Sequence, residues 1–185
     1  MKILLIEDMA GFAVPIRQQL EARGHTVTWI IGANTVSADR LQGILVGKDA
    51  TPMNDSWDGD ADRLVEVVYG DFDLALSDGG LIGTVDSGAP IVNALSKFGI
   101  PCIGITGGGA GNRLLTDNGA IAGVPKEFVV LAIQADLLPT EKTLTDKDFT
   151  SLATCLDSFT HEMREKAEQA RKAGTKFHHG YPVLE

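Results

Sequence analysis

Residues 1–8 read MKILLIED, so four consecutive apolar residues at positions 3–6 run directly into Glu7 and Asp8. A run that is apolar at every position, instead of alternating, is typical of a strand buried on both faces of a parallel sheet. Four further runs, at residues 27–31, 72–76, 102–105 and 120–124, are mostly apolar along their length and do not alternate. The chain therefore carries five candidate strands for a sheet that is covered on both faces.

Amphipathic segments separate these runs and predict helices. Phe12, Ile16 and Leu20 recur at four-residue spacing, and Gly24 ends that pattern. Similar patterns predict helices over residues 64–70, 91–99, 112–116 and 126–137. Strand and helix thus alternate five times, which predicts a doubly wound α/β sandwich.

Two segments exceed what such a unit needs. The first is an insertion at about residues 32–56. Connections longer than about 12–15 residues are uncommon, and this one exceeds that length. We expect a small strand or a helical turn within it, at residues 41–46. The second is a long helix that Thr145 or Asp146 can cap and that runs to about residue 172. Its apolar residues recur every three or four positions: Phe149, Leu152, Leu156, Phe159, Met163, Ala167 and Ala170. That stripe must be buried on the sandwich or against a second copy. We favour a homodimer, because the predicted sheet helices already cover both faces.

Composition narrows the classes of function. The chain has 185 residues, with 16 Lys and Arg against 25 Asp and Glu, a net charge of −9. Such a surface disfavours binding to nucleic acids and anionic membranes. No apolar run approaches the ~20 residues that span a bilayer, and the first apolar run is too short for a signal peptide, so we expect a cytoplasmic protein. Cys102 and Cys155 suit reduced core thiols.

Polar residues follow four of the five apolar runs. Ligands of open parallel sheets bind beyond the carboxyl ends of the strands. Glu7 and Asp8 follow the first run, Asp78 follows the third, Thr106 the fourth and Lys126 the fifth. We therefore expect three carboxylates, one hydroxyl and one ammonium group to meet at one edge of the sheet.

These residues and their spacing resemble the receiver domain of two-component response regulators. The stretches that carry the resemblance are ILLIED (3–8), IRQQLEARGHTV (16–27), FDLALSD (72–78), IPCIGIT (100–106) and NGAIAGVPK (118–126). The resemblance implies a flavodoxin-like, five-stranded parallel sheet in the order 2-1-3-4-5. It also implies a receiver-like domain over residues 1–137, interrupted by the insertion, and a C-terminal helical extension and tail over residues 138–185.

The resemblance also implies a function. Asp78 would accept a phosphoryl group from a histidine kinase or a phosphotransfer protein, and Thr106 and Lys126 would contact that group. Glu7, Asp8 and Asp78 would hold Mg²⁺, a cation that prefers oxygen ligands, and Gly80 could add its backbone carbonyl. Such a protein is primarily a signalling phosphoacceptor with self-catalysed phosphotransfer and autodephosphorylation. Its output would pass to a downstream protein by direct contact, and the sequence identifies neither that protein nor the kinase.

The sequence departs from the receiver pattern near Lys126. Pro125 precedes the lysine instead of following it, and Gly123 stands where the family has an aromatic residue. These departures leave open a pseudo-receiver that acts as a binding module without phosphorylation. A third reading is a small α/β nucleotide-binding protein that uses the glycine-rich loop from Gly107 to Gly111. That loop lacks both the G-x-G-x-x-G and the G-K-[ST] signatures.

Overall fold

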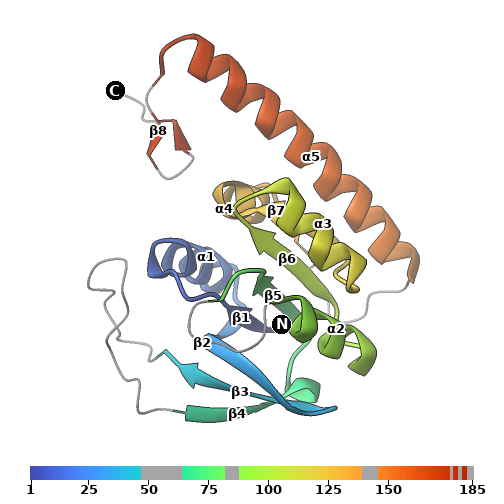
Figure 1. Ribbon diagram of the computed structural model, residues 1–185. Helices are drawn as coiled ribbons and strands as arrows, with labels where there is room; N and C mark the ends of the chain where they lie inside the picture. Colours follow the sequence, from blue (N-terminus) through green and yellow to red (C-terminus); the bar gives the residue numbers. More distant parts are fainter. Residues whose placement is uncertain (47–63, 82–87, 139–145, 176, 179–180, 183–185) are drawn as a thin grey trace.

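The computed structural model describes residues 1–46, 64–81, 88–138, 146–175, 177–178 and 181–182. Within these residues seven strands form one sheet in the order β4-β3-β2-β1-β5-β6-β7 (Figure 1). Five of them pair in parallel and overlap the five apolar runs: β2 (Thr26–Ser37), β1 (Lys2–Ile6), β5 (Leu74–Asp78), β6 (Cys102–Thr106) and β7 (Ala122–Pro125). The flavodoxin-like order 2-1-3-4-5 is therefore confirmed for the parallel part of the sheet. Two short strands, β8 (Phe177–His178) and β9 (Tyr181–Pro182), form a separate ladder.

Helices cover the sheet in two layers that bury two separate cores. The helices of one face are α1 (Ala10–Ala22) and α4 (Lys126–Gln134), and those of the other are α2 (Gly88–Phe98) and α3 (Gly109–Asp117). Successive side chains of a strand point to opposite faces. Accordingly, Ile3 and Leu5 belong to the core beneath α1 and α4, whereas Leu4 and Ile6 belong to the core beneath α2 and α3.

The described residues between β2 and β5 form two strands and a short 3-10 turn, and the helix predicted over residues 64–70 was wrong. β3 (Arg40–Leu45) pairs antiparallel with β2, and β4 (Leu64–Val68) pairs antiparallel with β3. The sequence of β4, LVEVV, holds three valines, whose β-branched side chains suit a pleated strand. Gly70 lies in a 3-10 turn, η1 (Tyr69–Asp71), instead of ending a helix. Part of the predicted insertion thus extends the sheet, while residues 47–56 lie outside the described residues.

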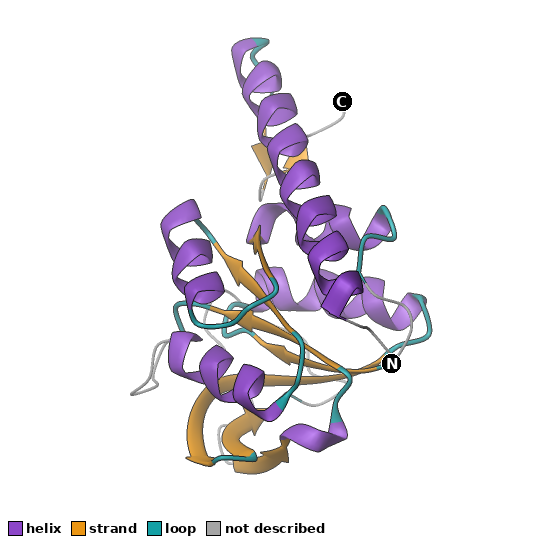
Figure 2. Ribbon diagram, turned by 90° about the vertical axis from the view of Figure 1, so that its right-hand side faces the viewer, coloured by secondary structure: helices purple, strands orange, loops and turns teal. Residues whose placement is uncertain are grey.

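The long C-terminal helix, α5 (Asp146–Lys172), has the predicted bounds and packs on its own chain. It lies against β7, the edge strand of the sheet, and against α4, and its C-terminal turns project beyond the other helices (Figure 2). Leu156 is fully buried in the core shared by α1 and α4, and Leu152 and Phe159 pack beside it. At Leu156 the apolar stripe therefore docks within the chain, the arrangement that we ranked second. We favoured a homodimer because the predicted helices already cover both faces of the sheet. That argument overlooked the edge of the sheet, where α5 packs against β7.

The structure also tests the predictions that concern the two cysteines and membrane-spanning helices. Cys102 is buried in β6, as a core thiol should be, but Cys155 is exposed on α5, so the prediction of a core thiol was wrong there. Among the residues that the structure describes, no helix is both long and apolar enough to cross a membrane.

Candidate functional site

The carboxyl ends of the parallel strands bring the expected polar residues together. The register of β1 against β5 aligns Ile6 with Ser77, so the residues that follow them, Glu7 and Asp78, are neighbours at the edge of the sheet. Thr106 ends β6, the strand on the other side of Asp78. The geometry of the parallel sheet alone is thus enough to gather residues that lie up to about 100 positions apart in the sequence.

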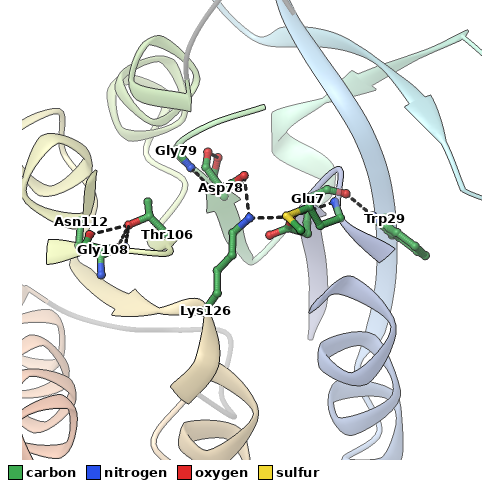
Figure 3. Close-up of polar contacts among 10 residues, drawn as sticks. Glu7, Trp29, Asp78, Gly79, Thr106, Gly108, Asn112 and Lys126 are labelled. Carbon is green, nitrogen blue, oxygen red and sulfur yellow. Dashed lines mark hydrogen bonds and ion pairs between the residues drawn. The ribbon is translucent and has the colours of Figure 1, made fainter. Parts of the chain in front are cut away.

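Lys126 is the first residue of α4 and reaches across the edge to both carboxylates. Figure 3 shows its side chain extending between Asp78 and Glu7. Its Nζ atom lies 2.8 Å from Oε1 of Glu7 and 2.9 Å from Oδ2 of Asp78. The exposed fractions are 7% for Lys126, 0% for Glu7 and 3% for Asp78. Charges this deeply buried are stable only when paired, so these three side chains form one interdependent unit.

The electrostatics of this unit shift two pKa values. Burial, followed by the nearby charge of Asp78, raises the pKa of Glu7 to about 8, although Lys126 and the Met9 amide oppose the shift. Burial alone would lower the pKa of Lys126, but the adjacent Glu7 and Asp78 carboxylates outweigh it and raise the pKa above its ordinary value. The Lys126 ammonium group is therefore charged throughout the physiological pH range.

The carboxylates fit a divalent cation. Oxygen atoms of Glu7, Asp8 and Asp78 all lie within 4.8 Å of one another. Oε2 of Glu7 is buried and accepts no hydrogen bond from the described residues. This oxygen atom is therefore available as a ligand for a cation. Carboxylate and carbonyl oxygens are the ligands that Mg²⁺ prefers, and a divalent charge relieves the repulsion among clustered carboxylates. Gly80 lies two residues beyond Asp78, and both residues line one cavity.

Thr106 is held by the glycine-rich loop on the other side of Asp78. Its hydroxyl group donates either to the Gly108 carbonyl oxygen, at 2.8 Å, or to Oδ1 of Asn112, at 3.0 Å. The Gly108 amide in turn donates to the Thr106 oxygen at 3.3 Å. A Cβ atom on Gly111 would lie 2.8 Å from that oxygen, so the loop can approach Thr106 only because residue 111 has no side chain. The glycine-rich loop therefore positions Thr106 within the same site.

A cavity of about 460 Å³ opens over Asp78. Its polar wall consists of Asp78, Lys126, Thr106 and the glycines of the two loops, and its apolar wall consists of Met9, Phe12 and Leu114. The Gly79 amide donates to Oδ1 of Asp78 at 2.6 Å, which fixes the carboxylate orientation. The cavity gives the Asp78 carboxylate room for one small substituent.

Asp78, Gly80, Thr106 and Lys126 line this cavity, and Glu7 and Asp8 lie beside Asp78. Four contacts that support these residues were not predicted. The Met9 amide donates to Oε1 of Glu7, and the Trp29 indole donates to the Glu7 carbonyl oxygen at 2.7 Å. The Phe12 ring centre lies 5.3 Å from the Lys126 Nζ atom, within the range of a cation–π contact. Asn112, which bonds Thr106, completes the set. No sequence signal marks Asn112 for this role.

Comparison with known proteins supports the fold. No protein-family model matches this chain, and no curated protein matches its sequence. Among solved structures, NtrX from Brucella abortus in complex with ADP superposes with a TM-score of 0.50 and 14% identity, covering 91% of this chain and 33% of that one. A response regulator from Burkholderia pseudomallei, with a phosphorylated aspartic acid, calcium ion and citrate, superposes with a TM-score of 0.46 and 19% identity. The match covers 76% of this chain and 68% of that one. A response regulator receiver domain protein from Clostridium thermocellum superposes with a TM-score of 0.42 and 18% identity. The match covers 72% of this chain and 91% of that one. At 14% identity, the likeness to NtrX shows a shared α/β fold and no more than the fold.

Proposed function

We propose that this chain is a receiver protein of a histidine-to-aspartate relay, in which Asp78 accepts a phosphoryl group from a histidine kinase or a phosphotransfer protein. The observation that carries the proposal is the placement of Asp78. Its carboxylate is fixed by the Gly79 amide and the Lys126 ammonium, faces a cavity, and lies beside two further carboxylates. This set of groups matches the chemical needs of phosphoryl transfer to a carboxylate better than those of nucleotide binding.

The proposed step is a displacement at phosphorus. A carboxylate oxygen of Asp78 attacks the phosphorus of a phosphohistidine, an O–P bond forms as the N–P bond breaks, and the released imidazole takes up a proton from solvent. Lys126 and Thr106 would donate hydrogen bonds to the phosphoryl oxygens, which is the positioning and charge stabilisation that phosphoryl transfer requires. Mg²⁺ held by Glu7, Asp8, Asp78 and the Gly80 carbonyl would neutralise further charge on those oxygens.

The contacts that pass the signal to a downstream protein would differ from those of the receiver family, which has an aromatic residue at the position of Gly123. A Cβ atom on Gly123 would lie 2.5 Å from the Asn112 Cβ atom, so an aromatic residue at position 123 would require Asn112 to move. Thr106 instead contacts Asn112 at the start of α3, directly beside α5. A change in the position of Thr106 would therefore reach α3 and α5 first. We propose that a downstream protein in the cytoplasm reads this region.

The test is phosphorylation of the purified chain by acetyl phosphate, followed by intact-protein mass spectrometry. The wild-type chain should gain one phosphoryl group in the presence of Mg²⁺, and Asp78→Asn should gain none, because an amide cannot form the acyl phosphate. Asp71→Asn is the matched control, since it makes the same charge change on an exposed residue of η1. Asp8→Ala should retain phosphorylation at a lower rate and with weaker dependence on Mg²⁺. Equal phosphorylation of wild type and Asp78→Asn would refute the assignment, and no phosphorylation of the wild type would favour the pseudo-receiver.

A further inference from the structure

A second cleft, distinct from the cavity over Asp78, lies between α3, β7 and α5. Its volume is about 650 Å³, which falls within the ~300–1,000 Å³ typical of small-molecule sites. Gly123 of β7 and Asn112 of α3 form part of its wall, and α5 contributes Thr160 and Arg164.

Two buried polar side chains in the wall of this cleft have unsatisfied atoms. The amide nitrogen of Asn112 and the hydroxyl oxygen of Thr160 have no hydrogen-bond partner among the described residues. These residues are only 7% and 6% exposed. Buried polar groups are nearly always hydrogen-bonded in folded proteins, so an unpartnered pair that lines one cleft indicates a missing polar partner there.

The charge around the cleft indicates the chemistry of that partner. Arg113 of α3 and Arg164 of α5 both line it, and neither forms an ion pair with any residue that the structure describes. A guanidinium nitrogen of Arg164 lies 3.7 Å from the position of a Cβ on Gly109, the first residue of α3, where the helix dipole is positive. Asp157 is the single carboxylate among the lining residues, and His161 pairs with Glu165. Positive groups therefore predominate in a chain whose net charge is −9.

We propose that this α3–β7–α5 cleft binds a small molecule that carries a phosphate or carboxylate group. Arg113 and Arg164 would hold the anionic group, which guanidinium groups recognise by paired hydrogen bonds. Asn112 and Thr160 would bond the neighbouring polar atoms of the ligand. The lining of this cleft includes neither Asp78 nor any other residue of the acidic cluster.

The proposal is tested on the full-length chain by NMR, using the side-chain amide signal of Asn112, which is assigned by its loss in Asn112→Ala. Inorganic phosphate and citrate are titrated separately without Mg²⁺, at constant ionic strength. We expect a saturable shift of the Asn112 signal with at least one of them, and the tighter of the two identifies phosphate or carboxylate as the preferred group. Arg164→Gln should weaken that binding by at least about tenfold. Arg171→Gln, with the same charge change further along α5, should leave it unchanged.

Two outcomes of the titrations would overturn the proposal, and a third comes from a variant of Thr160. One is the absence of a saturable shift with either anion, and the other is equal weakening in Arg164→Gln and Arg171→Gln, which would show an adventitious ion only. Thr160→Val supplies a second check, because valine keeps the shape and removes the hydroxyl group. Since that hydroxyl has no described partner, Thr160→Val should weaken anion binding without lowering the melting temperature of the free protein. A lower melting temperature would show that the hydroxyl is part of the protein's own hydrogen bonding.

Discussion

Replacing Leu156 with alanine tests whether α5 docks on its own sheet. Leu156 is fully buried in the core that α1 and α4 share, so the truncation removes apolar contacts and leaves a cavity. Such changes cost about 2–5 kcal/mol. We expect about 3 kcal/mol, because α5 lies at the edge of the sheet and can shift to fill part of the space. For a chain of this size, that loss corresponds to a decrease of roughly 6–12 °C in melting temperature.

The assay is urea unfolding followed by circular dichroism at several protein concentrations. Leu114→Ala is the control, because Leu114 is 48% exposed on α3, and it should change the free energy of unfolding by less than about 0.5 kcal/mol. If Leu156 packs in cis, the loss is independent of protein concentration. The reasoning is refuted if Leu156→Ala costs no more than the control, or if its effect disappears as the concentration rises, as expected for a residue buried between two chains.

Two glycine substitutions test close approaches around the site. A Cβ atom on Gly88 would overlap the Asp78 carbonyl oxygen, so Gly88→Ala should cost about 3 kcal/mol or more in urea unfolding, whereas Gly107→Ala, with open space around it, should cost less than about 0.5 kcal/mol. Gly123→Ala should cost about 1–3 kcal/mol and shift the NMR signal of the Asn112 side-chain amide, because the new methyl group would lie 2.5 Å from the Asn112 Cβ atom. Equal stability of Gly88→Ala and Gly107→Ala, or an unmoved Asn112 signal in Gly123→Ala, would contradict these packing arguments.

The parallel sheet was predictable because its strands coincide with runs that are mostly apolar and do not alternate. α5 was predictable because its apolar stripe keeps a helical period over many turns. β4 was not predictable by the same means. Its five residues are too few to distinguish helical from strand periodicity, and at its partner, β3, the sequence left a small strand and a helical turn both open. The pairing of β3 with β4 is a tertiary effect, and it overrode the local reading of Leu64 and Val67 as one helix face.

The core of the candidate site was predictable for a different reason. Glu7, Asp78 and Thr106 end or follow strands, so sheet geometry alone places them together. Phe12 and Asn112 lie on helices, and their contacts with Lys126 and Thr106 depend on how each helix packs on the sheet. No sequence spacing specifies that packing.

The central claim is that Asp78, and no other residue of the chain, accepts a phosphoryl group. It is tested most directly by treating the protein with acetyl phosphate and Mg²⁺, digesting it rapidly at low temperature, and locating the phosphoryl group by tandem mass spectrometry. The account predicts a single modified position, Asp78, and its disappearance when Mg²⁺ is withheld or when Glu7 and Asp8 are both replaced by alanine. A phosphoryl group found on Glu7, on Asp8 or on a histidine, with Asp78 unmodified, would contradict the account.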